Sequence, residues 1–125
     1  MGEAASASGI LVVDDDLDTA QMFAMLLQEL GHAVEYVTRP QPVLEIAKRM
    51  KPWLIFLDIG LPGINGWDLA RLLRRELGHE AVRIVAITGY GDVEDHKRSR
   101  EAGFDAHVRK PVDIHLLQSI LAELK

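Results

Sequence analysis

Acidic side chains stand directly after two apolar runs of this sequence. Asp14, Asp15 and Asp16 follow Ile10–Val13, and Asp58 ends the apolar part of IFLDIGLPGING. Carboxylates that lie close together repel one another, and a cation between them relieves that cost. If Asp14, Asp15 and Asp58 meet in the fold, Mg²⁺ is the expected cation, because it commonly binds one or two carboxylates together with water and phosphate.

A hydroxyl and an ammonium stand after two later apolar runs, at Thr88 and Lys110. Lysine is a compact positive charge suited to a phosphate or a carboxylate, and a threonine hydroxyl can donate to a phosphoryl oxygen. Pro111 restricts the backbone of Lys110 to extended conformations and permits a cis peptide bond. The sequence therefore supplies groups that could bind phosphate as well as groups that could bind a metal.

The loop after Asp58 has little side-chain bulk near the carboxylate. Gly60, Gly63 and Gly66 follow in that loop, so a phosphoryl donor can approach closely. A metal, a cation, a hydroxyl donor and an oxygen nucleophile are the groups that phosphoryl transfer requires. We therefore predict that Asp58 is the nucleophile.

Each of these residues also has a simpler interpretation. Asp14–Asp16 would cap the helix that follows them, a role that we expect mainly for Asp16. Lys110 would be a solvated surface lysine, and Thr88 a threonine of the kind common at strand ends. The position of Lys110, after an inner strand and before a proline, favours the functional interpretation.

Short apolar runs predict the strands that must position these groups. Runs of branched apolar residues without alternation are typical of strands buried on both faces. The expected strands are Ile10–Val13, Val34–Val37, Trp53–Leu57, Ile84–Ile87 and Ala106–Val108.

The segments between these strands have helical periodicity and glycines where helices end. The expected helices are Leu17–Leu30, Val43–Met50, a helix with Leu69, Leu72 and Leu73 that ends near Gly78, Val93–Ala102, and a last helix capped by Asp113 with Leu116, Leu117, Ile120, Leu121 and Leu124. This alternation is a (βα)₅ pattern, so we predict an α/β fold with a doubly wound parallel sheet and helices on both faces. Ligands of such sheets bind at the carboxyl ends of the strands, where the acids, Thr88 and Lys110 stand.

Composition limits the remaining possibilities. The chain has 125 residues, which suits one domain. It has no cysteine and a net charge of −5, which excludes thiol chemistry and argues against direct nucleic-acid binding. No apolar stretch approaches the roughly 20 residues that span a bilayer, and no signal peptide is present. We expect a cytoplasmic domain over residues 9–125, after a tail at residues 1–8 that is disordered or was added for expression.

The motifs at the strand ends resemble those of the response-regulator receiver domains of two-component signalling and phosphorelays. The resemblance rests on ILVVDDD, FLDIGLPGING, VAITGYG and EAGFDAHVRKP, and covers residues 9–124. Together these motifs are specific, whereas any one alone would be weak. The resemblance implies a flavodoxin-like sheet with strand order 2-1-3-4-5.

The resemblance also implies a role for each candidate residue. Asp15 would bind Mg²⁺ directly, supported by Asp14, and the backbone carbonyl of Gly60 would complete the metal site with Asp58. Asp58 would take a phosphoryl group from a histidine kinase or a histidine phosphotransfer domain, making the chain a phosphoprotein. Thr88 and Lys110 would hold the phosphoryl oxygens, and the bond from Lys110 to Pro111 would be cis. The domain would assist only its own phosphorylation and dephosphorylation, and would not be a general enzyme.

Three positions depart from the usual pattern of that family. His107 replaces a tyrosine or phenylalanine that acts as a switch, and a histidine can titrate near neutral pH; the alternative is an ordinary strand residue. Gly60 replaces a larger or polar residue, and Gly89 makes the loop after Thr88 more flexible. Such departures are typical of receivers attached to hybrid sensor kinases, so the expected output partner is a downstream protein or a linked kinase core.

Two other classes of function are alternatives to the switch. A haloacid-dehalogenase-type phosphatase also uses an aspartate, Mg²⁺ and a lysine. Its nucleophile follows the first strand with a second aspartate two residues later, whereas Asp58 follows the third strand and is followed by Gly60. A pseudo-receiver, which binds proteins without phosphorylation, remains the main alternative, although every acidic, hydroxyl and lysine position is intact.

Overall fold

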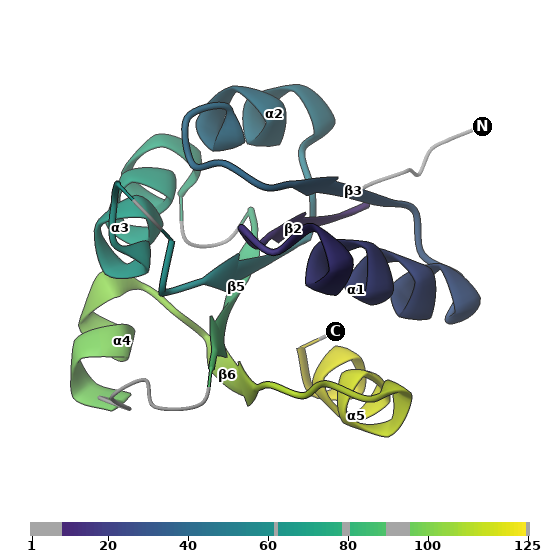
Figure 1. The fold of residues 1–125 in the computed structure, drawn as a ribbon. Coiled ribbons are helices and arrows are strands. Elements are labelled where there is room, and N and C mark those ends of the chain that lie inside the picture. The colour runs from purple at the N-terminus through teal and green to yellow at the C-terminus, as the bar shows by residue number, and fades with distance from the viewer. Residues whose placement is uncertain (1–8, 62, 79–80, 90–95, 125) are drawn as a thin grey trace.

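Five parallel strands form one sheet at the centre of the molecule (Figure 1). The structure is a computed structural model that describes residues 9–61, 63–78, 81–89 and 96–124. The strands are β2 (Ile10–Val13), β3 (Val34–Val37), β4 (Leu54–Asp58), β5 (Arg83–Thr88) and β6 (Ala106–Arg109). Their order in the sheet is β3-β2-β4-β5-β6. This is the 2-1-3-4-5 order in sequence terms, so the predicted fold class and strand order are confirmed.

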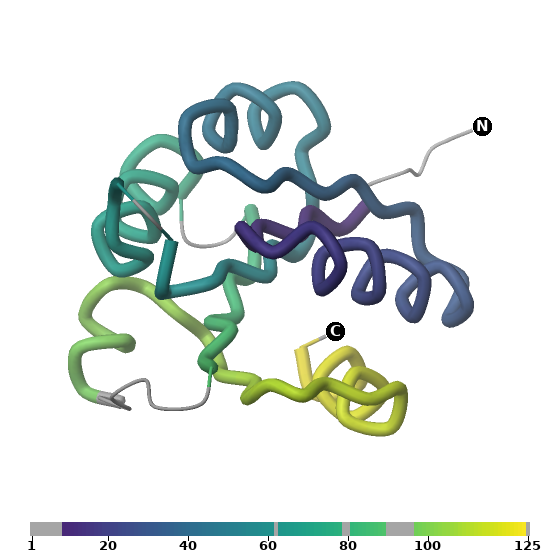
Figure 2. Tube along the Cα trace, in the orientation of Figure 1, coloured from purple at the N-terminus to yellow at the C-terminus, as the bar shows by residue number. Residues whose placement is uncertain are grey.

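Helices cover both faces of this sheet. They are α1 (Leu17–Glu29), α2 (Val43–Met50), α3 (Gly66–Leu77), α4 (His96–Ala102) and α5 (Ile114–Leu124). Helices α1 and α5 lie side by side on one face, and α2, α3 and α4 follow one another over the other face (Figure 2). Strands that follow one another in the sequence are each joined through a helix, as a parallel sheet requires.

Two apolar cores fill the space between the sheet and its helices. Successive residues of a strand point to opposite faces, so Ile10 and Val12 enter the core under α1 and α5, while Leu11 and Val13 enter the core under α2 and α3. All four are fully buried. The unbroken apolar run of β2 is explained by burial on both faces.

The register brings the ends of the inner strands to one edge. Val13 of β2 pairs with Leu57 of β4, so the residues that follow them, Asp14 and Asp58, are neighbours. Asp58 in turn pairs with Ile87, the residue before Thr88. Three groups that are far apart in the sequence thus meet at one edge by strand pairing alone.

Most boundaries agree with the sequence, but three strands extend one residue further toward the site, β6 reaching Arg109. The third and fourth strands continue to Asp58 and Thr88, which were predicted to stand just beyond them. The reason is backbone pairing, since Ile59 N still donates to Ile87 O at 3.2 Å. The fourth helix is described from His96, and its predicted start at Val93 lies outside the described residues.

The helix ends confirm two caps that the sequence predicts. Asp16 accepts from the N–H of Asp18 at 3.2 Å, and Asp113 accepts from the N–H of Leu116 at 2.9 Å. Gly31, with φ 94°, follows α1 in the left-handed conformation that glycine adopts readily. Asp16 is therefore a structural residue.

Candidate functional site

Three carboxylates gather at the carboxyl edge of the sheet. Oxygen atoms of Asp14, Asp15 and Asp58 all lie within 4.8 Å of one another. Asp14 is fully buried and Asp58 is 5% exposed, whereas Asp15 is exposed to solvent. The predicted acid cluster therefore exists, with two buried members and one that faces outward.

Lys110 supplies the positive charge of the cluster. Its Nζ lies 2.9 Å from Asp14 Oδ2 and 3.4 Å from Asp58 Oδ2. Lys110 is placed by the end of β6, where its backbone N–H donates to Thr88 O at 2.8 Å, and its bond to Pro111 is cis. The simpler interpretation as a solvated surface lysine is wrong for the side chain in this structure.

Backbone N–H groups fix the orientation of both buried carboxylates. Gly60 N donates to Asp58 Oδ1 at 2.8 Å, and Asp16 N donates to Asp14 Oδ1 at 2.9 Å. The second oxygen of each aspartate faces Lys110. A Cβ atom at Gly60 would stand 3.4 Å from Asp58 Oδ1, so the absence of a side chain there leaves the approach to Asp58 open.

Burial and charge shift the protonation of this cluster. Burial raises the pKa of the Asp58 carboxyl to about 6 and Asp14 adds to the rise, while the Gly60 N–H and Lys110 oppose it. Burial lowers the pKa of the Lys110 ammonium, but its contacts with Asp14 and Asp58 outweigh that effect and the pKa is raised. The Lys110 side chain therefore stays positively charged. A cation beside Asp58 favours the charged form of its carboxyl group.

The donor set fits Mg²⁺. Three carboxylates face one ammonium, so the fully ionised cluster keeps an excess of two negative charges. Mg²⁺ prefers oxygen ligands and binds commonly through one or two carboxylates. Asp15 and Asp58 are the residues that would hold it, with Asp14 beside them and the carbonyl of Gly60 within the same loop.

Thr88 lies at the carboxyl edge beside the cluster, whereas His107 lies further back on β6. Thr88 is the last residue of β5 and is buried, and its hydroxyl donates to Val108 O at 3.4 Å. His107 pairs with Ala86 on β6, and its ring centroid lies 6.4 Å from that of Phe104. The structure therefore brings Asp14, Asp15, Asp58 and Lys110 into one cluster, and places Thr88 at its edge with its hydroxyl directed to β6.

A small cavity adjoins Lys110, which sequence reasoning missed. It has a volume of about 280 Å³ and is lined by Thr19, Met22, Phe23, Lys110, Pro111 and Val112. Its walls come from α1 and from the segment after β6. No local pattern predicts it, because the two walls are separated by most of the chain.

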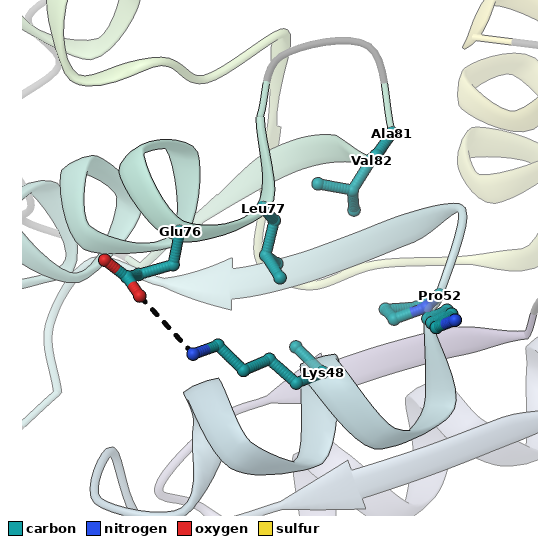
Figure 3. Close-up of a pocket in the computed structure, with 8 residues that line it drawn as sticks. Lys48, Pro52, Glu76, Leu77, Ala81 and Val82 are labelled. Atoms are coloured by element: carbon teal, nitrogen blue, oxygen red, sulfur yellow. Dashed lines mark hydrogen bonds and ion pairs between the residues drawn. The ribbon is translucent and has the colours of Figure 1, made fainter.

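A second cavity of about 320 Å³ lies at the opposite edge of the sheet (Figure 3). It is formed by the ends of α2 and α3 and the residues before β4 and β5, and Lys48 pairs with Glu76 at 3.3 Å beside it. Its lining residues are Ala47, Lys48, Lys51, Pro52, Glu76, Leu77, Ala81 and Val82. These are mainly apolar groups and one ion pair, so the carboxyl edge, and not this cavity, is the candidate functional site.

The fold and this site together define a class of protein. A model of the family "Response regulator receiver domain" matches residues 10–122, and the chain belongs to that family. Receiver domains are signalling switches of two-component systems, interact with histidine kinases or phosphotransfer proteins, and are not classical enzymes. The resemblance drawn from the motifs is confirmed.

Curated relatives share the receiver region. The chain is 36% identical to the DNA-binding response regulator MtrA of Mycobacterium tuberculosis over 102 residues, which is 82% of this chain and 43% of MtrA. It is 34% identical to the transcriptional regulatory protein CreB of Escherichia coli, over 82% of this chain and 44% of CreB. The chain thus spans less than half the length of these two regulators.

Solved structures show the same fold. A receiver domain from Methylobacillus flagellatus has a TM-score of 0.84 and 29% identity, with 96% of this chain and 100% of that chain covered. The chemotaxis protein CheY4 of Vibrio cholerae has a TM-score of 0.87 at 22% identity, with 96% and 100% covered. Among the described residues, we find no helix long and apolar enough to cross a membrane.

Proposed function

We propose that this domain is a phosphoryl-accepting switch in which Asp58 takes a phosphoryl group from the phosphohistidine of a histidine kinase or phosphotransfer domain. The observation that carries the proposal is the contact of Lys110 with both Asp14 and Asp58, at the edge where Asp15 completes the acid cluster. An ammonium beside the nucleophile, and two further carboxylates that would bind Mg²⁺ with it, suit the transfer of a dianionic group.

The transfer step uses the carboxylate of Asp58 as the nucleophile. A carboxylate oxygen attacks phosphorus, the bond from phosphorus to the imidazole nitrogen breaks, and the departing imidazole takes a proton from water. Mg²⁺ held by Asp15 and Asp58 would supply positive charge to the phosphoryl oxygens. Gly60 has no side chain beside Asp58 Oδ1, where a Cβ atom would stand 3.4 Å away, and this leaves more room for the donor imidazole.

The remaining residues respond to the new charge. Lys110, which contacts Asp58 before transfer, pairs with a phosphoryl oxygen afterwards. The Thr88 hydroxyl leaves Val108 O, where its contact is long at 3.4 Å, and donates to another phosphoryl oxygen. These movements alter the ends of β5 and β6, and we propose that the surface of α4, β6 and α5 then changes its affinity for a protein partner.

Intact mass after incubation with Mg²⁺ and phosphoramidate or acetyl phosphate tests the proposal. We expect a gain of one phosphoryl mass in the wild-type protein and none in Asp58→Asn. Asp68→Asn is the matched control, because Asp68 is an exposed aspartate in the first turn of α3. Phosphorylation that persists in Asp58→Asn would overturn the assignment, and no gain with either donor would favour a receiver-like binding module that works without phosphate.

A further inference from the structure

Trp67 joins the helix after the Asp58 loop to α4. Its indole Nε1 donates to Ser99 Oγ at 3.2 Å, and the guanidinium carbon of Arg98 lies 3.9 Å from the centre of the indole ring. Ser99 is 2% exposed, so the hydrogen bond is shielded from water. Both contacts connect α3 with α4, which lie side by side in Figure 1.

The Trp67 end of this connection is fixed to the backbone beside Asp58. Gly66 N donates to Ile59 O at 3.2 Å, and Ile59 follows Asp58 directly. A Cβ atom at Gly66 would stand 2.4 Å from Ile59 Cα, so glycine is required for this close approach. A displacement of the backbone at Asp58 is therefore passed to the first turn of α3, where Trp67 lies.

The Ser99 end is fixed to the turn that leads into β6. Ser99 O accepts from Gly103 N at 3.1 Å and from Phe104 N at 3.0 Å, which ends α4. The chain then enters β6, which carries His107 and leads to Lys110. Trp67 and Ser99 thus link the Asp58 loop with the segment that delivers the lysine.

We propose that Trp67, Ser99 and Arg98 form a latch that holds α4 in its unphosphorylated position, and that phosphorylation of Asp58 releases it. The inference rests on the proposed function of Asp58. Thr88 contacts β6 through Val108 O and the Lys110 N–H, and β6 follows the turn that is bonded to Ser99 O. Turning Thr88 toward a phosphoryl group therefore displaces the segment after α4, while the indole holds α4 to α3. The new position of Thr88 and the hydrogen bond between Trp67 and Ser99 are incompatible, so the latch contacts break when α4 moves.

A latch of this kind has a thermodynamic consequence. Contacts present only in the unphosphorylated state disfavour the phosphorylated one, so removing them must raise the affinity for a phosphoryl mimic. Losing one hydrogen bond or cation–π contact of ordinary strength corresponds to a rise of about threefold to tenfold. A contact that served only stability would leave this affinity unchanged.

The test is a titration with beryllofluoride, an aspartyl-phosphate mimic, at saturating Mg²⁺ and followed by ¹⁹F NMR. We expect tighter binding in Trp67→Phe, which keeps an aromatic ring without the N–H, and in Ser99→Ala. The double variant should gain no more than Trp67→Phe alone, because both changes remove the same hydrogen bond. Trp53→Phe is the matched control and should bind like the wild type, because Trp53 lies just before β4 and packs on the other core.

Fluorescence gives a second readout that does not require a weakened latch. In Trp53→Phe, Trp67 is the remaining tryptophan, and its emission should shift to the red when beryllofluoride binds, as the indole leaves buried Ser99. Unchanged or weaker affinity in both latch variants, or an emission that stays constant on binding, would overturn the latch while leaving the switch intact. Failure of the wild type to bind the mimic would overturn the switch and the latch together.

Discussion

At the scale of single residues, the site depends on the positive charge of Lys110, which offsets the negative charges of Asp14 and Asp58. Its ammonium contacts two buried carboxylates from different strands, and each of those also receives a backbone N–H. A buried carboxylate that loses a charged partner keeps the full cost of its own burial. The lysine therefore acts on the folded state before any phosphoryl group is present.

Replacing Lys110 should expose this dependence. In Mg²⁺-free buffer, Lys110→Gln should lower the free energy of unfolding by about 1–3 kcal/mol, because Asp14 and Asp58 lose their cation. Added Mg²⁺ should restore more stability to this variant than to the wild type, since it replaces the missing positive charge. Urea unfolding with and without Mg²⁺ measures both effects. Equal stabilisation of the two proteins by Mg²⁺ would show that Lys110 does not compensate the charge of Asp14 and Asp58.

The raised pKa of Asp58 makes Mg²⁺ binding depend on pH. Burial raises this pKa to about 6 in the metal-free protein, so the carboxyl takes up a proton as the pH falls through that value. Below it Mg²⁺ must displace the proton, and the affinity should fall by up to about tenfold per pH unit. Calorimetric titration at pH 7.5 and pH 5 checks this, and Asp58→Asn should lose most of the difference. Equal wild-type affinities at both values would show that Asp58 does not take part.

At the scale of elements, a buried arginine holds α3 against the turn after α4. Arg74 Nε donates to Gly103 O at 2.8 Å, and its Nη2 donates to Asp105 Oδ2 at 2.6 Å. The same aspartate oxygen accepts from Ile84 N at 2.8 Å, at the start of β5. Gly103 has φ 105° and lies so close to Arg74 that a Cβ atom would stand 2.5 Å from Arg74 Cγ. This network lies at the edge of the sheet opposite the site.

Removing this guanidinium should cost stability without affecting the chemistry at Asp58. Arg74→Met should lower the free energy of unfolding by about 1–3 kcal/mol, since the Gly103 carbonyl and Asp105 lose hydrogen bonds from a buried guanidinium. Arg71→Met is the matched control, because Arg71 is exposed on the same helix and pairs with Asp68; its cost should stay below about 0.5 kcal/mol. Denaturant unfolding gives both values, and similar costs for the two variants would refute a structural role for Arg74.

The elements themselves were largely predictable, and their contacts were not. The apolar runs and glycine stops predicted all five strands and the caps at Asp16 and Asp113, because burial on both faces and helix termination have local patterns. The extension of β4 to Asp58 was missed, since it depends on pairing with Ile87 across the sheet. The burial of Arg74 depends on its contacts with Gly103 and Asp105, which no local pattern indicates.

At the scale of the whole molecule, the site lies where the two cores meet the carboxyl edge of the sheet. Asp14 follows β2 and Asp58 ends β4, and residues of both strands belong to each core. An ion can bind there only in the folded state, because the ligands come from distant parts of the chain. Binding must therefore stabilise the entire fold.

Thermal unfolding should show this linkage. Mg²⁺ at one hundred times its dissociation constant should add about 2.7 kcal/mol to the stability of the folded protein and raise the Tm accordingly. Asp15→Asn should lose most of the rise, whereas Asp18→Asn, an exposed residue of the first turn of α1, should keep it. A Tm that does not respond to Mg²⁺ in the wild type would contradict a metal site at this edge.

By itself, the sequence determined the order of strands and helices, the family, and which polar residues end the inner strands. These properties follow from local patterns, since periodicity and strand ends can be read within a few residues. Only the tertiary structure decided that Lys110 contacts Asp14 and Asp58, that Thr88 turns to Val108, and that Trp67 reaches Ser99. Such contacts join residues far apart in the chain, and their geometry is set by how helices pack on the sheet, which no local pattern specifies.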